Sequence, residues 1–113
     1  MKQFPKYRKA LRALRAECPT ELPVRVRFSF APNHPDHLGR HNYGATTRTK
    51  GGITITMFRR RGRRWMTDEE LMDTIVHEWA HALDWRPAVA GEDIHSPTWG
   101  VHYAAAYRAT IED

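Results

Sequence analysis

Cysteine is almost absent from this chain of 113 residues, in which Cys18 is the single thiol. One cysteine excludes an internal disulfide and any multi-cysteine zinc ribbon. Long apolar runs are also missing, which argues against a membrane-spanning helix. The basic N-terminal segment has no continuous apolar stretch and no small-residue cleavage site, so we expect no secretory signal. A cytoplasmic protein with no membrane partner is the simplest interpretation.

Acidic residues are scarce in the first half of the chain and basic residues in the second. Residues 1–64 contain 16 Lys and Arg against 3 Asp and Glu, whereas residues 65–113 contain 2 against 10. Such a division indicates an anionic partner for the first half, or mutual attraction of the two halves in the folded chain.

The length predicts one domain over residues 1–113. An apolar stripe over residues 4–18 predicts an amphipathic helix, and the strict alternation of 24–30 predicts a half-buried strand. Two β-prone runs on either side of Gly51-Gly52 predict a hairpin. A capping box at residues 67–70 opens a helix that ends near Trp85, and Pro97 opens a last helix. The expected fold is α+β, with a small three-stranded antiparallel or mixed sheet.

An arginine cluster follows the predicted hairpin, and we expect it to form an exposed basic loop. Its members are Arg59, Arg60, Arg61, Arg63 and Arg64, and Phe58 and Trp65 flank them. Arginines contact phosphates and an aromatic ring can stack on an unpaired base, so the cluster is a candidate contact for DNA. A solvated loop, paired with the acidic helix that follows, is the alternative interpretation.

The segment TIVHEWAHALDW, residues 74–85, carries a pattern typical of zinc hydrolysis. His77 and His81 lie one helical turn apart, so both imidazoles can reach one ion. Glu78 is offset by one residue and can reach a water molecule on that ion. Zinc lowers the pKa of such a water, and the glutamate can take its proton as it attacks a carbonyl carbon. A helix with two surface histidines and a glutamate is the alternative.

A working zinc site needs a third protein ligand, for which Glu92, Asp93, His95 and His102 are the candidates. Glu92 lies in a loop that follows too closely after the helix of His77 and His81. His95 stands just ahead of a helix cap at Ser96, where a loop can fold its side chain back towards the first two histidines. We therefore favour His95 over the other three.

Together with IHSPTWGVHYAAAYR, residues 94–108, the motif resembles the SprT family of zinc metallopeptidases, which includes the Spartan proteases. The resemblance covers about residues 50–108 and implies a zincin-like minimal metallopeptidase domain. It implies zinc as the cofactor, with His77, His81 and His95 as its ligands and Glu78 as the general base. Family members act on proteins attached to DNA, which implies a protein or peptide substrate and recruitment to DNA. The chain departs from the family pattern at Ser96, where glycine is usual, and from its single cysteine we expect no zinc ribbon of the kind that many members carry.

The second hypothesis is a non-enzymatic nucleic-acid or protein-binding module, with a zincin-like fold and structural zinc. Glu78 argues against it, because a purely structural site needs no general base.

His34, His37 and His41 share one polar loop, where we expect solvent-exposed side chains in preference to a second metal site. Tyr103 is a candidate oxyanion donor, but its place in a helical apolar stripe favours packing.

Overall fold

The computed structural model describes residues 5–29, 44–58, 60–61, 64–85 and 97–111. It is a small α+β fold, as the sequence predicts, with three helices and a three-stranded mixed sheet. The helices are α1 (Pro5–Glu17), α2 (Asp68–Leu83) and α3 (Pro97–Thr110). The sheet is formed by β1 (Val24–Ser29), β2 (Gly44–Thr49) and β3 (Gly52–Phe58), and the short strands β4 (Arg60–Arg61) and β5 (Arg64–Trp65) form a separate pair.

The sheet has the strand order β1-β3-β2. β3 is its central strand, parallel to β1 and antiparallel to β2, so β2 forms one edge. The hairpin expected around Gly51-Gly52 is confirmed as the β2–β3 connection. A Cβ atom on Gly52 would overlap the Pro23 carbonyl oxygen, which accepts a hydrogen bond from the Ile53 amide at 2.8 Å. Glycine at position 52 therefore allows β3 to meet the start of β1.

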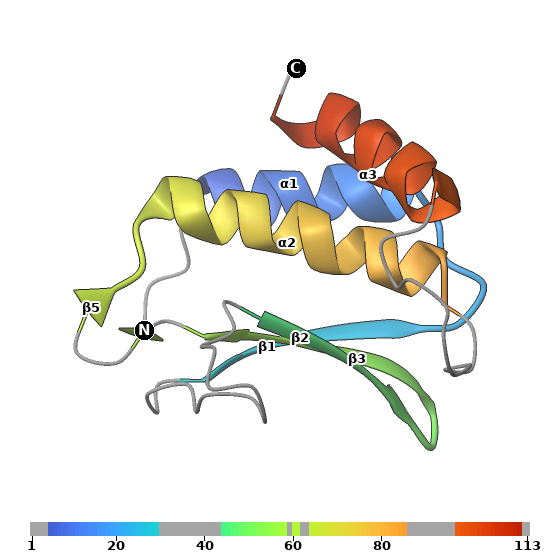
Figure 1. Ribbon diagram of the computed structural model, residues 1–113, viewed down its shortest axis with the longest axis horizontal. Helices are drawn as coiled ribbons and strands as arrows, with labels where there is room; N and C mark the ends of the chain where they lie inside the picture. The colour runs from blue at the N-terminus through green and yellow to red at the C-terminus, as the bar shows by residue number, and fades with distance from the viewer. Residues whose placement is uncertain (1–4, 30–43, 59, 62–63, 86–96, 112–113) are drawn as a thin grey trace.

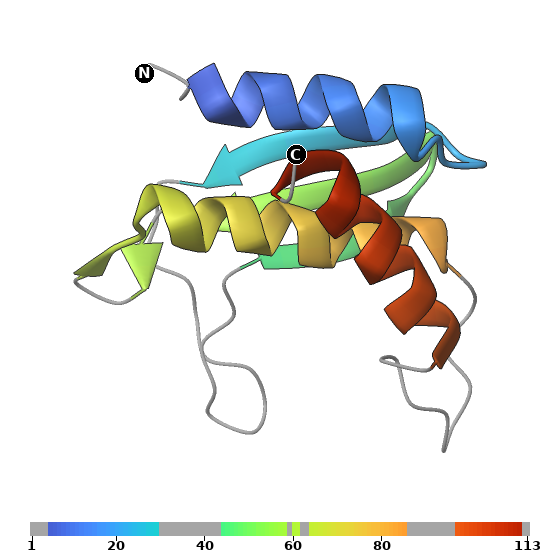
Figure 2. The ribbon, with the colours of Figure 1, turned by 90° about the horizontal axis from the view of Figure 1, so that it is seen from above.

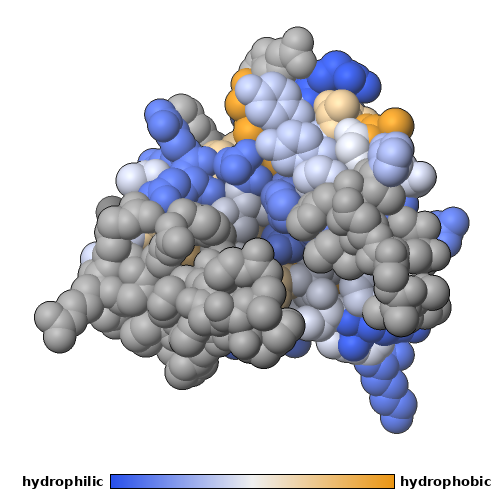
Figure 3. All heavy atoms as spheres, in the orientation of Figure 1, coloured by the Kyte–Doolittle hydropathy of each residue, from blue (hydrophilic) through white to orange (hydrophobic). Residues whose placement is uncertain are grey.

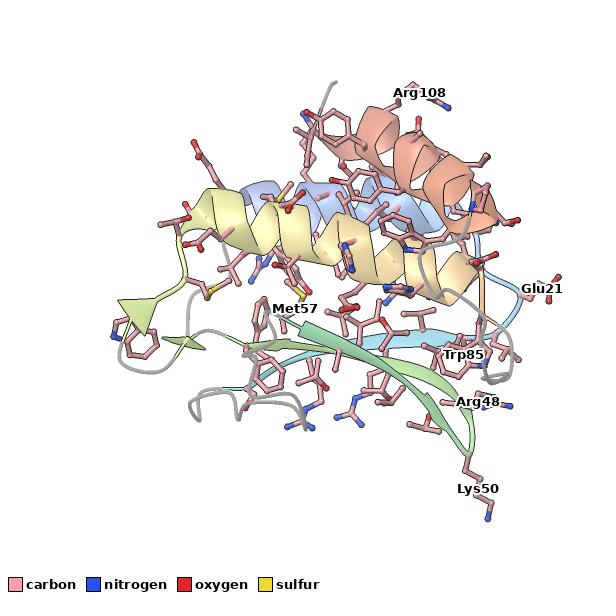
Figure 4. The ribbon with its side chains drawn as sticks, in the orientation of Figure 1. Glu21, Arg48, Lys50, Met57, Trp85 and Arg108 are labelled. Atoms are coloured by element: carbon pink, nitrogen blue, oxygen red, sulfur yellow. The ribbon has the colours of Figure 1, made fainter. Side chains whose placement is uncertain are left out.

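The helices all lie on one side of the sheet (Figure 1). α1 and α2 cover its upper face, and α3 packs on α2 and α1 on the side away from the strands, crossing them at an angle (Figure 2). The core fills the interface between the helices and the sheet, where Met57 is fully buried below α2 (Figure 4). Its other large, fully buried members are Leu14, Ile53, Ile55, Leu71, Ile75, Val76 and Trp79.

The alternation predicted for β1 is confirmed, because Val24 is buried and packs in the core whereas Arg25 and Arg27 are exposed. β3 alternates in the same way, with Ile53, Ile55 and Met57 buried. These buried side chains pack in the core with residues of the helices.

The start of α2 is fixed by the capping box that the sequence predicts. The Thr67 hydroxyl accepts from the Glu70 amide at 3.2 Å, and the Thr67 amide donates to the Glu70 carboxylate at 3.1 Å. These two bonds satisfy backbone donors that an uncapped helix leaves unpaired. The helix therefore begins at Asp68.

Part of the arginine cluster lies in two short strands, and not in the loop that we expected. Arg60 pairs with Trp65 and Arg61 with Arg64, which makes β4 and β5 an antiparallel hairpin. The side chain of Trp65 is 57% exposed, whereas Arg59 and Arg63 lie outside the described residues.

The surface shown in Figure 3 carries its most apolar atoms over α3, where Val101 and Ile111 are exposed. Within the described part of the chain, no helix combines the length and apolar character needed to cross a bilayer.

Candidate metal centre

His77 and His81 come together on one side of α2. Their rings meet edge to face at 71°, with centroids 4.8 Å apart, and both side chains are half-buried. The two Nε2 atoms are 3.2 Å apart. A spacing of four residues on a regular helix produces this convergence, as the sequence predicts.

The separation of the two Nε2 atoms fits a zinc ion. Nitrogen ligands about 2.05 Å from one tetrahedral zinc lie about 3.3 Å from each other. The observed 3.2 Å is close to that value. A carboxylate oxygen of Glu78 joins the cluster, since one ligand atom from each of the three residues lies within 4.8 Å of the others. The donor set therefore suits zinc, and a tetrahedral ion held by the two imidazoles has two further coordination positions.

Glu78 is the one buried carboxylate among the described residues, with 7% of its surface exposed. Burial raises the pKa of the Glu78 carboxyl to about 7, and the hydrogen bond that it accepts from Thr46 lowers the pKa in part. The donor is the Thr46 hydroxyl, 2.9 Å from Oε2. A carboxyl group with a pKa near neutrality can both accept and return a proton, as a general base requires.

β2 approaches α2 closely enough for this bond because position 44 has no side chain. A Cβ atom there would lie 2.9 Å from Thr74 Cγ2, 3.0 Å from the Thr56 carbonyl oxygen and 3.2 Å from Glu78 Cγ. Gly44 and Thr46 are two residues apart on one strand and therefore share a sheet face. Neither residue could be predicted from the sequence, because no motif connects them to α2.

α3 supplies an aromatic wall beside the histidines. The Trp99 ring centroid lies 5.0 Å from that of His77 and 5.4 Å from that of His81. Tyr103 stacks on Trp99 at 5.2 Å and donates its hydroxyl to the Asp73 carboxylate at 2.9 Å. The tyrosine therefore packs as the sequence favours, and its hydroxyl is bonded to α2.

Several residues singled out in the sequence lie outside the described part of the chain. They include the favoured third ligand His95, the alternatives Glu92 and Asp93, and the loop histidines His34, His37 and His41. His102 is half-buried on α3, and Asp84 forms the C-cap of α2. The described structure brings together His77, Glu78 and His81, and it adds Thr46 and Trp99 to them.

No family model, curated protein or solved structure matches the chain. Its function is therefore inferred from its own residues.

Proposed function

We propose that the chain is a zinc-dependent metallopeptidase with a zincin-like domain, as its resemblance to the SprT family implies. The observation that carries the proposal is the convergence of the His77 and His81 Nε2 atoms, 3.2 Å apart, beside the buried carboxylate of Glu78. A candidate ion site and a buried carboxylate thus share two turns of one helix.

The chain's own residues divide the chemistry between them. A bound zinc ion supplies Lewis acidity, which lowers the pKa of water and polarises a carbonyl group. His77 and His81 would hold the ion. Glu78 accepts the proton of the attacking water at a carboxylate oxygen and delivers it to the nitrogen of the leaving amine.

His95 is the proposed third ligand. It precedes Trp99 by four residues, and four residues span at most about 14 Å. Trp99 itself lies against both histidines. The start of α3 is therefore close enough for the chain to return His95 to the pair.

The edge position of β2 supports a peptide as substrate. Among the described strands β2 pairs with β3 alone, so its other edge presents backbone donors and acceptors. An extended peptide can add to such an edge as a further strand. Because Thr46 of β2 contacts Glu78, a peptide held there would run beside the base.

Recruitment to DNA is a further part of the proposal and depends on the β4–β5 hairpin. The pairing of Arg61 with Arg64 brings basic residues of two strands together, next to the exposed ring of Trp65. Phosphate contacts and base stacking are the interactions that such residues provide.

A cytoplasmic setting, expected from the single cysteine, is part of the same proposal.

The proposal is tested by removing and restoring the metal. The purified protein should contain zinc by elemental analysis and cleave labelled casein or histones. A chelator should abolish cleavage, and one equivalent of zinc should restore it. A zinc-loaded protein that cleaves neither substrate, with or without DNA, would leave the non-enzymatic module with structural zinc as the better account. Absence of zinc at neutral pH would overturn both.

A further inference from the structure

We propose that Thr46 is a positioning residue, whose hydroxyl fixes the Glu78 carboxylate in the orientation that proton transfer requires. This inference rests on the proposed role of Glu78 as general base. It assigns to β2 a part in the chemistry that the motif on α2 does not contain.

The Thr46 hydroxyl lies within hydrogen-bonding distance of both the carboxylate and the backbone carbonyl of Glu78. Thr46 Oγ1 lies 2.9 Å from Glu78 Oε2 and 3.1 Å from the Glu78 carbonyl oxygen. A hydroxyl has one hydrogen, so it donates to one of these acceptors at a time. A bond to an ionised carboxylate is the stronger of the two, which favours donation to Oε2. One side chain from β2 thus spans the backbone and the carboxylate of the same residue.

Donation to Oε2 has a consequence for the other oxygen. It occupies one lone pair of Oε2 and leaves Oε1 as the second oxygen that can accept the proton. It also restricts rotation of the carboxylate, which has three side-chain torsions and would otherwise reorient. A base held in one orientation loses less entropy at the moment of transfer.

The surrounding packing makes the contact specific. Gly44 brings β2 against Thr74 and Glu78, and the half-buried Thr46 follows it on the same face. Thr46 is opposite the buried Ile55 of the central strand, and this pairing fixes its register in the sheet. The hydroxyl is therefore held from the sheet side while the carboxylate is held from α2.

A plain structural role, in which the hydroxyl only satisfies a buried carboxylate, does not predict a fall in kcat at constant KM and zinc content. The test compares Thr46→Val, which keeps the shape but removes the hydroxyl, with Thr46→Ser, which keeps the hydroxyl. Thr54→Val is the matched control, because Thr54 lies on β3 between buried Ile53 and Ile55 and so faces away from α2. Zinc content, kcat and KM are measured for each zinc-loaded protein with fluorescently labelled casein.

We expect Thr46→Val to lower kcat about tenfold or more with KM changed less than about twofold. Its zinc content should equal that of the wild type. Thr46→Ser should return kcat to within about threefold of the wild type, and Thr54→Val should match the wild type. A wild-type kcat in Thr46→Val overturns the proposal. So does an equal loss in the valine and serine variants, or a loss of zinc that accompanies the loss of rate.

A second measurement is independent of cleavage. If the wild type cleaves nothing, the proposed function fails, and the positioning contact is then judged by a double-mutant cycle. The cycle combines Thr46→Val with Glu78→Ala in urea unfolding of the zinc-free protein. A coupling of about threefold or more in the unfolding equilibrium constant supports the contact, and additive effects overturn it.

Discussion

At the scale of single residues, the most informative side chain is Glu78. An ionised carboxylate costs free energy when it leaves water, and one hydrogen bond from Thr46 offsets that cost only in part. An apolar residue facing β2 would pack at this position without the cost. The proposed role of Glu78 in proton transfer accounts for its burial beside two convergent histidines.

Spacing alone predicts the residues of α2 at this scale. The three-residue cluster of His77, Glu78 and His81 follows from helical periodicity, and the structure brings its ligand atoms within 4.8 Å. Thr46 could not be predicted, because it contacts Glu78 across 32 residues of sequence. No sequence pattern marks Gly44 either, because the absence of its side chain matters only when β2 packs on α2.

Gly44→Ala tests how tightly β2 is held to that helix. The new methyl group would meet Thr74 Cγ2 at 2.9 Å and the Thr56 carbonyl oxygen at 3.0 Å. Because the backbone oxygen cannot move aside cheaply, we expect the variant to lose about 1–3 kcal/mol of unfolding free energy in urea denaturation.

Gly51→Ala is the control for this prediction. A Cβ atom at Gly51 has nothing within 4 Å, so stability should change by less than about 0.5 kcal/mol. Equal stability of the two variants would show that β2 and α2 are less closely packed than described.

At the scale of elements, α2 is the helix that the sequence defines best. Its capping box and its apolar face both appear in the structure as predicted, and Ile75, Val76 and Trp79 are buried. What no pattern could show is its attachment to α1. The Trp79 indole donates to the Cys18 carbonyl oxygen at 2.9 Å, and the Arg15 guanidinium lies 5.7 Å from the indole ring. The hydrogen bond joins residues 61 positions apart in sequence.

The packing of α1 on the sheet gives a prediction about alkaline pH. The Tyr7 ring lies 4.9 Å from that of Phe28 on β1, and burial raises the pKa of the Tyr7 hydroxyl to about 12. In the unfolded chain the hydroxyl ionises near pH 10. Between pH 10 and 12 the unfolded state therefore binds fewer protons than the folded state, so stability falls as the pH rises.

Tyr7→Phe removes this ionisation. Relative to the wild type, the variant should gain about 2 kcal/mol of unfolding free energy between pH 9 and pH 12. Urea denaturation at several pH values measures the difference. Parallel pH profiles for the two proteins would show that the Tyr7 hydroxyl is as accessible to water in the folded state as in the unfolded one.

At the scale of the whole molecule, the mixed sheet explains how a small chain can build the candidate site. The parallel pairing of β1 with β3 leaves β2 at the edge, directly below the end of α2 that carries Glu78. Alternation of apolar residues predicts strands but not their direction, so the sequence left an antiparallel or a mixed sheet open.

The recruitment to DNA that we propose for the β4–β5 hairpin predicts salt-sensitive binding. In a gel shift at low salt the wild type should retard single-stranded DNA, and the complex should weaken as salt rises. Arg61→Gln/Arg64→Gln should weaken binding about tenfold, because the pair belongs to the β4–β5 hairpin.

Lys9→Gln/Arg12→Gln is the matched control, since it removes the same charge from the exposed face of α1. It should change binding less than about twofold. Equal weakening by both double variants would attribute binding to net charge alone. Absence of wild-type binding at low salt would remove DNA from the account.

The most direct test of the central claim compares the kcat of zinc-loaded wild type and Glu78→Gln on labelled casein. The amide keeps the size of the side chain but cannot accept the proton of the attacking water. We predict that kcat falls by about 100-fold or more while the zinc content stays the same. A Glu78→Gln protein that holds zinc and cleaves at the wild-type rate would contradict the assignment of Glu78 as the base.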